Sequence, residues 1–123
     1  MVGFRLQDYE VINLPGANIY FGPHDEHRAV GFLRLDPHGT LLKHARPVEE
    51  WLVQVEGESD IIFFEDDKET KRVSLKRGTS LKIPPNQLHQ HISPTDDESL
   101  TSWHFDGNIL NVIDDIRKTY GNR

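Results

Sequence analysis

The sequence predicts an all-β fold, a closed sandwich or barrel, followed by one C-terminal helix. Short runs rich in β-branched and aromatic residues recur along the chain, and turn signals separate them about every 8 to 12 residues. Near residue 108 the hydrophobic period changes from that of strands to that of a helix. With 123 residues the chain is long enough for one domain with a core and too short for two, so we expect a single domain over residues 1–123.

The expected strands are short and end at turn residues. Leu14-Pro15-Gly16 and a polar turn at 66–70 are two of these signals. In the run 28–35, Val30, Phe32 and Leu35 alternate with weaker or polar residues, which predicts a half-buried strand. We expect a barrel core over about residues 28–105 and strands at 9–13, 18–22, 28–35, 50–56, 60–65, 71–76 and 99–105.

The C-terminal segment carries apolar residues at i, i+3, i+4, i+7 and i+11, which indicates a helix over about residues 109–120. Asn108 is a suitable N-cap, and Asn111 is an alternative. Lys118 in the last turn and Gly121 just beyond it are ordinary stop signals. We expect one apolar face to pack on the outside of the barrel or against a dimer partner, namely Ile109, Val112, Ile113, Ile116 and Tyr120.

The first stretch with chemical character runs over residues 39–57. His44 and Arg46 are two residues apart, so on a strand their side chains share one face. Pro47 has no N–H to donate to a sheet, so the strand should stop or turn there. Glu50 then opens a new run of β-forming residues. A hairpin of this kind brings an imidazole, a guanidinium and a carboxylate into one small space.

A second stretch, residues 78–93, repeats the spacing. His89 and His91 are two residues apart and follow a rigid turn, Pro-Pro-Asn at 84–86. On a strand these two imidazoles also share one face. The two stretches together therefore supply three histidines and the Glu50 carboxylate as candidate ligands.

The first stretch resembles the first of the paired motifs of the cupin superfamily, G-x5-H-x-H-x3,4-E-x6-G. The chain matches this motif at His44, Glu50 and Gly57, whereas Gly39 lies one residue closer to His44 than the motif requires. Arg46 stands where the second metal histidine of the family would be. This departure bears directly on the chemistry that the site can support.

The second stretch resembles the second cupin motif, G-x5-P-x-G-x2-H-x3-N. Gly78, Pro84 and His89 match in register. Asn86 replaces the glycine as a residue that also tolerates positive φ, and Ser93 replaces the asparagine. The resemblance covers about residues 30–105 and implies a jelly-roll barrel whose motif residues point into the lumen.

Neutral imidazoles and a carboxylate suit Fe, Mn, Ni, Zn or Cu, and two histidines with one carboxylate are typical of open non-haem iron sites. We therefore predict a divalent transition metal held by His44, Glu50 and His89, with His91 in the place left by Arg46. Two further residues are candidates for binding a small-molecule ligand together with Arg46. Gln54 shares strand parity with Glu50, and His104 lies on the last expected strand.

Arg46 leaves two interpretations open, because a guanidinium is not a metal ligand. In one, Arg46 turns outward or pairs with Glu49, and the histidines and Glu50 hold the metal. In the other, Arg46 pairs with Glu50 inside the barrel, and the cavity binds a small carboxylate or phosphate without metal.

The predicted function is that of a small metal-dependent cupin acting on a sugar-derived, keto-acid or aromatic small molecule. The alternative is a metal-free module that binds or senses small anions through Arg46. The net charge of −6 and the lack of a basic cluster argue against nucleic acid as a partner. No apolar run approaches the ~20 residues that span a bilayer, so we expect no membrane partner.

The expected compartment is the cytoplasm, because the N-terminus does not have the pattern of a signal peptide and the chain has no cysteine for disulfides. We also expect a homodimer. Trp51, Val53 and Val55 lie on the face opposite Glu50, so this strand is apolar on both sides. A strand of that kind needs a second layer or a partner.

Overall fold

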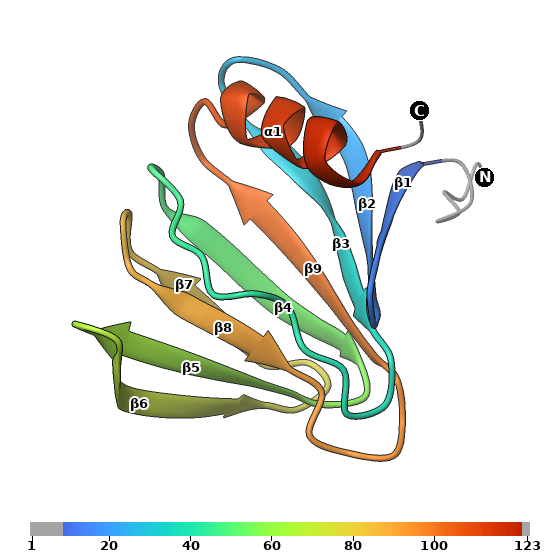
Figure 1. The fold of residues 1–123 in the computed structure, drawn as a ribbon, viewed down its shortest axis with the longest axis vertical. Helices are drawn as coiled ribbons and strands as arrows, with labels where there is room; N and C mark the ends of the chain where they lie inside the picture. The colour runs from blue at the N-terminus through green and yellow to red at the C-terminus, as the bar shows by residue number, and fades with distance from the viewer. Residues whose placement is uncertain (1–8, 122–123) are drawn as a thin grey trace.

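The computed structural model describes residues 9–121, in which it has nine strands and one helix (Figure 1). The N-terminal segment 1–8, in which we expect no signal peptide, lies outside the described residues. The elements are β1 (Glu10–Leu14), β2 (Ala17–His24), β3 (Ala29–Leu35), β4 (Glu50–Glu56), β5 (Ser59–Glu65), β6 (Lys68–Leu75), β7 (Ser80–Ile83), β8 (His89–Ile92), β9 (Ser99–Phe105) and α1 (Leu110–Tyr120).

The strands form two antiparallel sheets, which confirms the predicted all-β jelly-roll architecture. The larger sheet has the order β1-β2-β3-β9-β4-β7, and the smaller one has the order β6-β5-β8. Residues of both sheets share one buried cluster, so the sheets enclose a common core. Figure 1 shows the two layers meeting at the lower right and diverging toward the upper left.

The segment 40–44 lies along the free edge of β8. Thr40 bridges Ile92 and His44 bridges His89, but no continuous strand forms. The pairing ends after His44 because the chain then bends at 47–48 toward β4. The expected strand through His44 and Arg46 is thus reduced to two isolated bridges.

The inner face of the larger sheet is set by the alternation of β3 and β9. Ala29, Gly31, Leu33 and Leu35 are buried, whereas the residues between them on β3 are half-buried on the other face. The predicted half-buried strand forms and Leu35 is buried as expected, but the buried face is not that of Val30 and Phe32. The reason is Gly31, since a Cβ there would stand 2.2 Å from the Trp103 ring, which fills the space of the missing side chain.

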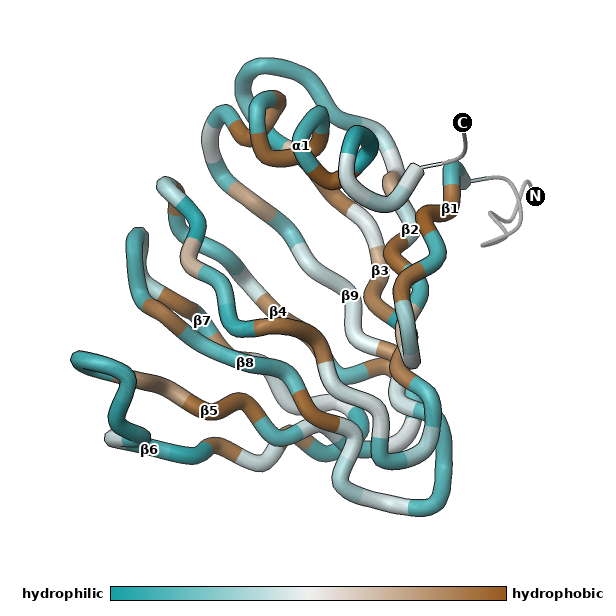
Figure 2. The backbone as a smooth tube through the Cα atoms, in the orientation of Figure 1, coloured by the Kyte–Doolittle hydropathy of each residue, from teal (hydrophilic) through white to brown (hydrophobic). Residues whose placement is uncertain are grey.

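The helix α1 lies across the ends of β2, β3 and β9 (Figure 1). Its Ile113 and the preceding Ile109 belong to the same buried cluster as Leu33 and Trp103 of the inner sheet face. The expectation that the apolar stripe packs on the outside of the barrel is therefore wrong. Figure 2 shows hydrophobic positions on the side of α1 that faces the strands.

Two element boundaries differ in detail from the prediction. Asp66 and Asp67 both have positive φ, 51° and 63°, so a two-residue turn joins β5 to β6 instead of the expected longer turn. At the start of α1, Ile109 occupies the N-cap position, and Asn108 Oδ1 accepts a hydrogen bond of 3.0 Å from the backbone N–H of Leu110.

In the described part of the chain, no helix is long and apolar enough to cross a membrane.

Candidate metal centre

Four potential metal ligands converge inside the barrel from three pieces of chain. His44 comes from the edge segment, Glu50 is the first residue of β4, and His89 and His91 lie on β8. One ligand atom of each lies within 4.8 Å of the others. His44 and His89 exchange backbone hydrogen bonds of 2.9 Å in both directions, which holds their rings next to each other. The structure thus brings together the whole predicted metal set.

Backbone carbonyls fix the tautomers of His44 and His89. His44 Nδ1 lies 2.9 Å from the carbonyl of Leu42, and His89 Nδ1 lies 2.8 Å from the carbonyl of Gln87. A carbonyl can only accept, so Nδ1 carries the proton in both rings and Nε2 keeps its lone pair. This arrangement is usual for histidines that bind metals through Nε2.

Three polar atoms of the cluster are buried and have no hydrogen-bond partner in the structure. They are Glu50 Oε1, His89 Nε2 and His91 Nδ1, in side chains whose residues are at most 4% exposed. Glu50 Oε1 and His89 Nε2 are 3.4 Å apart without hydrogen-bond geometry. Buried polar atoms are nearly always satisfied, so three such atoms in one cluster indicate a missing partner. A divalent cation fits this donor set of nitrogen and oxygen.

The imidazoles of His44 and His91 are held neutral. Burial, together with the charges of Arg46 and His89, lowers the pKa of His44 to about 3. Burial also lowers the pKa of His91 well below its ordinary value, with His89, His44 and Arg46 acting in the same direction. Neutral imidazoles are the form that binds metal, so no proton has to leave these two rings at neutral pH.

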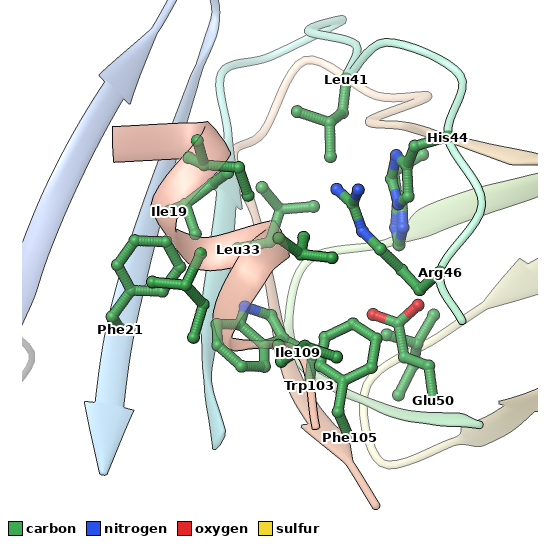
Figure 3. A pocket seen from close by; sticks show the side chains of 15 residues that line it. Ile19, Phe21, Leu33, Leu41, His44, Arg46, Glu50, Trp103, Phe105 and Ile109 are labelled. Atoms are coloured by element: carbon green, nitrogen blue, oxygen red, sulfur yellow. The ribbon is translucent and has the colours of Figure 1, made fainter. Parts of the chain in front are cut away.

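Arg46 lies in the lumen, contrary to the interpretation in which it turns outward. It is half-buried and lines two adjoining cavities together with His44. Figure 3 shows its guanidinium pointing into the cavity on the side of Leu41 and His44. Burial lowers its pKa and the Glu50 carboxylate raises it, but a guanidinium remains protonated in proteins.

Neither ion pair expected for Arg46 forms among residues 9–121. Glu49 instead lies 3.7 Å from the ammonium of Lys82, and Glu50 faces His89. Arg46 contributes its backbone carbonyl, which accepts a 2.7 Å hydrogen bond from the N–H of Asn86. Asn86 has a φ of 64°, which confirms that it takes the place of a turn glycine. This bond ties the first motif to the second.

The other two residues proposed for ligand binding lie away from the cluster. Gln54 is buried as expected, but its amide is already bonded to the Glu56 carbonyl, the Ser99 hydroxyl and Thr101. It therefore has a structural role in the barrel interior. His104 lies between the inward-facing Trp103 and Phe105 and so on the outer face of β9, which excludes it from the cavity.

The sequence predicted a cavity inside the barrel but did not show which residues form its walls. An inner space of about 40 Å³ adjoins a wider one of about 270 Å³, and the two share Ile19, Leu41, His44, Arg46, Val112 and Ile116. Apart from the site residues, the inner wall is made of aliphatic and aromatic side chains of the larger sheet and α1, together with Leu41 and Ile109 (Figure 3). The isoleucine stripe of the helix was the available signal, but its periodicity does not say which surface it covers.

Comparison with known proteins finds similar structures and no similar sequences. No family model matches the chain, and no curated protein matches it. An RmlC-like cupin from Shewanella frigidimarina is 18% identical with a TM-score of 0.70, and the match covers 86% of this chain and 90% of that chain. Drosophila melanogaster CENP-C bound to CAL1 is 16% identical with a TM-score of 0.70, over 80% of this chain and 81% of that chain.

Oxalate decarboxylase from Bacillus subtilis is 18% identical with a TM-score of 0.75. The match covers 85% of this chain and 30% of that chain, so this chain spans under a third of the enzyme. Identities at this level establish the fold and leave the activity open. By its two-sheet barrel and these structural likenesses, the chain has the fold of the cupin superfamily.

Proposed function

We propose that this chain binds one divalent transition metal inside the barrel and uses it to act on a small molecule. The observation that supports this most is the set of three buried, unpartnered atoms of Glu50, His89 and His91 gathered beside His44. Candidate metals are Fe, Mn, Ni, Zn and Cu, and the oxalate decarboxylase of Bacillus subtilis contains Mn(II) centres. Candidate substrates are sugar-derived, keto-acid or aromatic small molecules.

Each residue of the site has a distinct part in this proposal. His44 and His89 present Nε2 toward the cluster, and the Glu50 carboxylate offsets part of the charge of the ion. A bound divalent ion supplies Lewis acidity at this position. The apolar wall above the cluster lowers the local dielectric constant, which strengthens the electrostatic interactions inside.

The second candidate function is a metal-free module that binds or senses small anions. Arg46 favours it, because its guanidinium lies in the cavity without an ion-pair partner among the described residues. The composition of the inner wall also favours it. If His44, Glu50 and His91 all bind metal, Arg46 is the one charged or imidazole side chain left among the residues that line the inner cavity, and a guanidinium is a poor general acid or base.

Metal content separates the two candidates. We expect freshly purified protein to hold close to one equivalent of a divalent metal by elemental analysis, and His89→Ala to lose at least tenfold in metal affinity because a ligand is removed. His27→Ala is the matched control, since His27 is exposed and lies outside the cluster. It should keep the native metal content.

Arg46→His gives the complementary outcome, because it restores the histidine that the cupin motif has at this position. Tighter metal binding in this variant supports a position that faces the ligands. Metal that is absent from the native protein and appears only in Arg46→His would refute the first proposal and favour the anion-binding module.

A further inference from the structure

We propose that the ligand of this site is a small amphipathic acid, whose carboxylate binds Arg46 and whose apolar body lies in the cavity beneath α1. The inference deepens the proposed function by naming its substrate class. That the bound acid is a substrate rests on the proposed function. That the acid binds here rests on Arg46 and the cavity walls.

The first argument is the unbalanced charge of Arg46. The guanidinium is half-buried, and no hydrogen bond or ion pair engages it within residues 9–121. Half-buried charges without partners are unfavourable, and a planar guanidinium is shaped for two parallel hydrogen bonds to a carboxylate. An anionic group of the ligand would supply the missing partner.

The other charged groups around the cavity do not compensate Arg46. Glu50 belongs to the histidine cluster, and Asp115 is exposed on α1 at the cavity mouth. Lys43 stands over the Phe64 ring, with its ammonium 4.0 Å from the ring centre. A divalent cation in the cluster would add two positive charges against the single carboxylate of Glu50. With or without metal, an anion therefore improves the charge balance.

The second argument is the apolar character of the remaining wall. Apart from His44, Arg46, Glu50 and His91, the inner cavity is lined by aliphatic residues, two phenylalanines and Trp103. A sugar or a polyhydroxy acid would bury hydroxyls without partners on this inner wall, which is unfavourable. An aliphatic or aromatic body gains free energy from the same surface.

The third argument is the position of Arg46 between the two spaces. Ile19, Leu41, Arg46 and Ile116 line both the inner cavity of about 40 Å³ and the outer one of about 270 Å³. Together the two spaces lie at the lower end of the range of about 300–1,000 Å³ that is typical of ligand pockets, so this site fits a small molecule. An acid whose head group reaches Arg46 can place its tail against Ile19 and Ile116.

Calorimetric titration of the native protein tests this inference with hexanoate as the probe. Its two controls are hexanamide, which lacks the charge, and gluconate, which has the charge and a polar body. Each titration is run on chelator-treated protein and on Mn²⁺-loaded protein. We expect hexanoate to bind at least tenfold more tightly than either control.

Substitutions at Arg46 and Ile116 test separately the binding of the carboxylate and the binding of the apolar tail. Arg46→Gln should weaken hexanoate binding at least tenfold, Arg46→Lys should retain part of it, and the exposed Arg28→Gln should leave it unchanged. Ile116→Ser should weaken hexanoate binding and leave acetate binding unaltered, because acetate has no tail. Melting curves confirm that each variant is folded, and Arg46→Lys keeps the test decisive if Arg46→Gln does not fold.

The inference is overturned if native protein does not bind hexanoate, if gluconate binds as tightly as hexanoate, or if Arg46→Gln binds hexanoate like the native protein. These outcomes differ from failure of the metal proposal. If the protein holds metal but binds no acid, the proposed metal site is supported and this inference is refuted. If the protein binds hexanoate through Arg46 but holds no metal, this inference is supported and the proposed metal site is refuted.

Discussion

At the scale of single residues, the site depends on histidines that are oriented by their own backbone. His44 and His89 each donate Nδ1–H to the carbonyl two residues earlier, at Leu42 and Gln87. The bond sets the ring angle and the tautomer before any ligand arrives, which lowers the ordering cost of binding. The buried Nδ1 of His91 has no such partner among the described residues.

The neutral imidazoles predict how stability depends on pH. In the unfolded chain His44 titrates near 6.5, whereas in the folded protein its pKa is about 3, so the unfolded state binds more protons between these values. The free energy of unfolding of chelator-treated protein should therefore fall as the pH drops from about 6.5 toward 3. Each such histidine contributes up to about 1.4 kcal/mol per pH unit.

Urea unfolding at several pH values measures this slope. His44→Gln should flatten it in the range from pH 6 to about 4, because a glutamine does not titrate. The exposed His27→Gln serves as the control and should keep the native slope. A native slope that His44→Gln leaves unchanged would contradict the assignment of a buried, neutral His44.

At the scale of elements, α1 closes the cavity over the inner face of the larger sheet. Ile113 is 1% exposed and lies in the cluster that contains Trp103 and Leu33. The helix also contacts β1, where Arg117 forms a two-bond ion pair with Glu10 at 2.6 and 3.0 Å. The helix therefore determines both the stability of this end of the barrel and the shape of the ligand space.

Shortening Ile113 should show this coupling. Ile113→Ala is expected to lower the free energy of unfolding by about 2–4 kcal/mol, since it deletes buried carbon atoms and leaves a void beside the cavity. Asn111→Ala on the exposed side of the same helix should change it by less than about 0.5 kcal/mol. Equal small effects of the two variants in urea unfolding would refute the role of α1 as a packed cover.

At the scale of the whole molecule, the jelly roll leaves an apolar area on the outer face of β4. Trp51 and Val53 are 40% and 41% exposed, and the ammonium of Lys82 lies 4.7 Å from the Trp51 ring centre. The homodimer and the cytoplasmic location stay predictions. The exposed pair on β4 is the feature that agrees with a dimer, because large apolar side chains that gather on one face often mark an interface.

Light scattering tests the dimer directly. We expect a mass of about twice the chain mass of 14.2 kDa, and the double variant Trp51→Lys with Val53→Asp should give the monomer. Val11→Asp is the matched control, because Val11 is 40% exposed on β1 at the far edge of the same sheet. A native monomer at high concentration would rule the dimer out.

Several features of the molecule follow from local sequence signals. Runs of β-forming residues and turn signals predicted seven of the nine strands in the described part of the chain, all but β7 and β8. Helical periodicity predicted α1 within one residue of its observed start. The resemblance of the two stretches to the paired cupin motifs predicted which four side chains meet, because the motif residues are expected to point into one lumen. Asn86 was predicted as a turn residue with positive φ because it replaces the glycine of the second motif.

Other features were decided by contacts between distant parts of the chain. Trp103 packing on Gly31 selected the inner face of β3, against the larger side chains of Val30 and Phe32. The direction of Arg46 and the surface covered by α1 likewise depend on neighbours far away in sequence. The sequence alone thus determined the strands and the helix through short-range signals, and its resemblance to the paired cupin motifs indicated the ligand set. Only the tertiary structure decided the cavity, the orientation of Arg46 and the cover by α1, because packing and charge pairing depend on segments that local patterns do not connect.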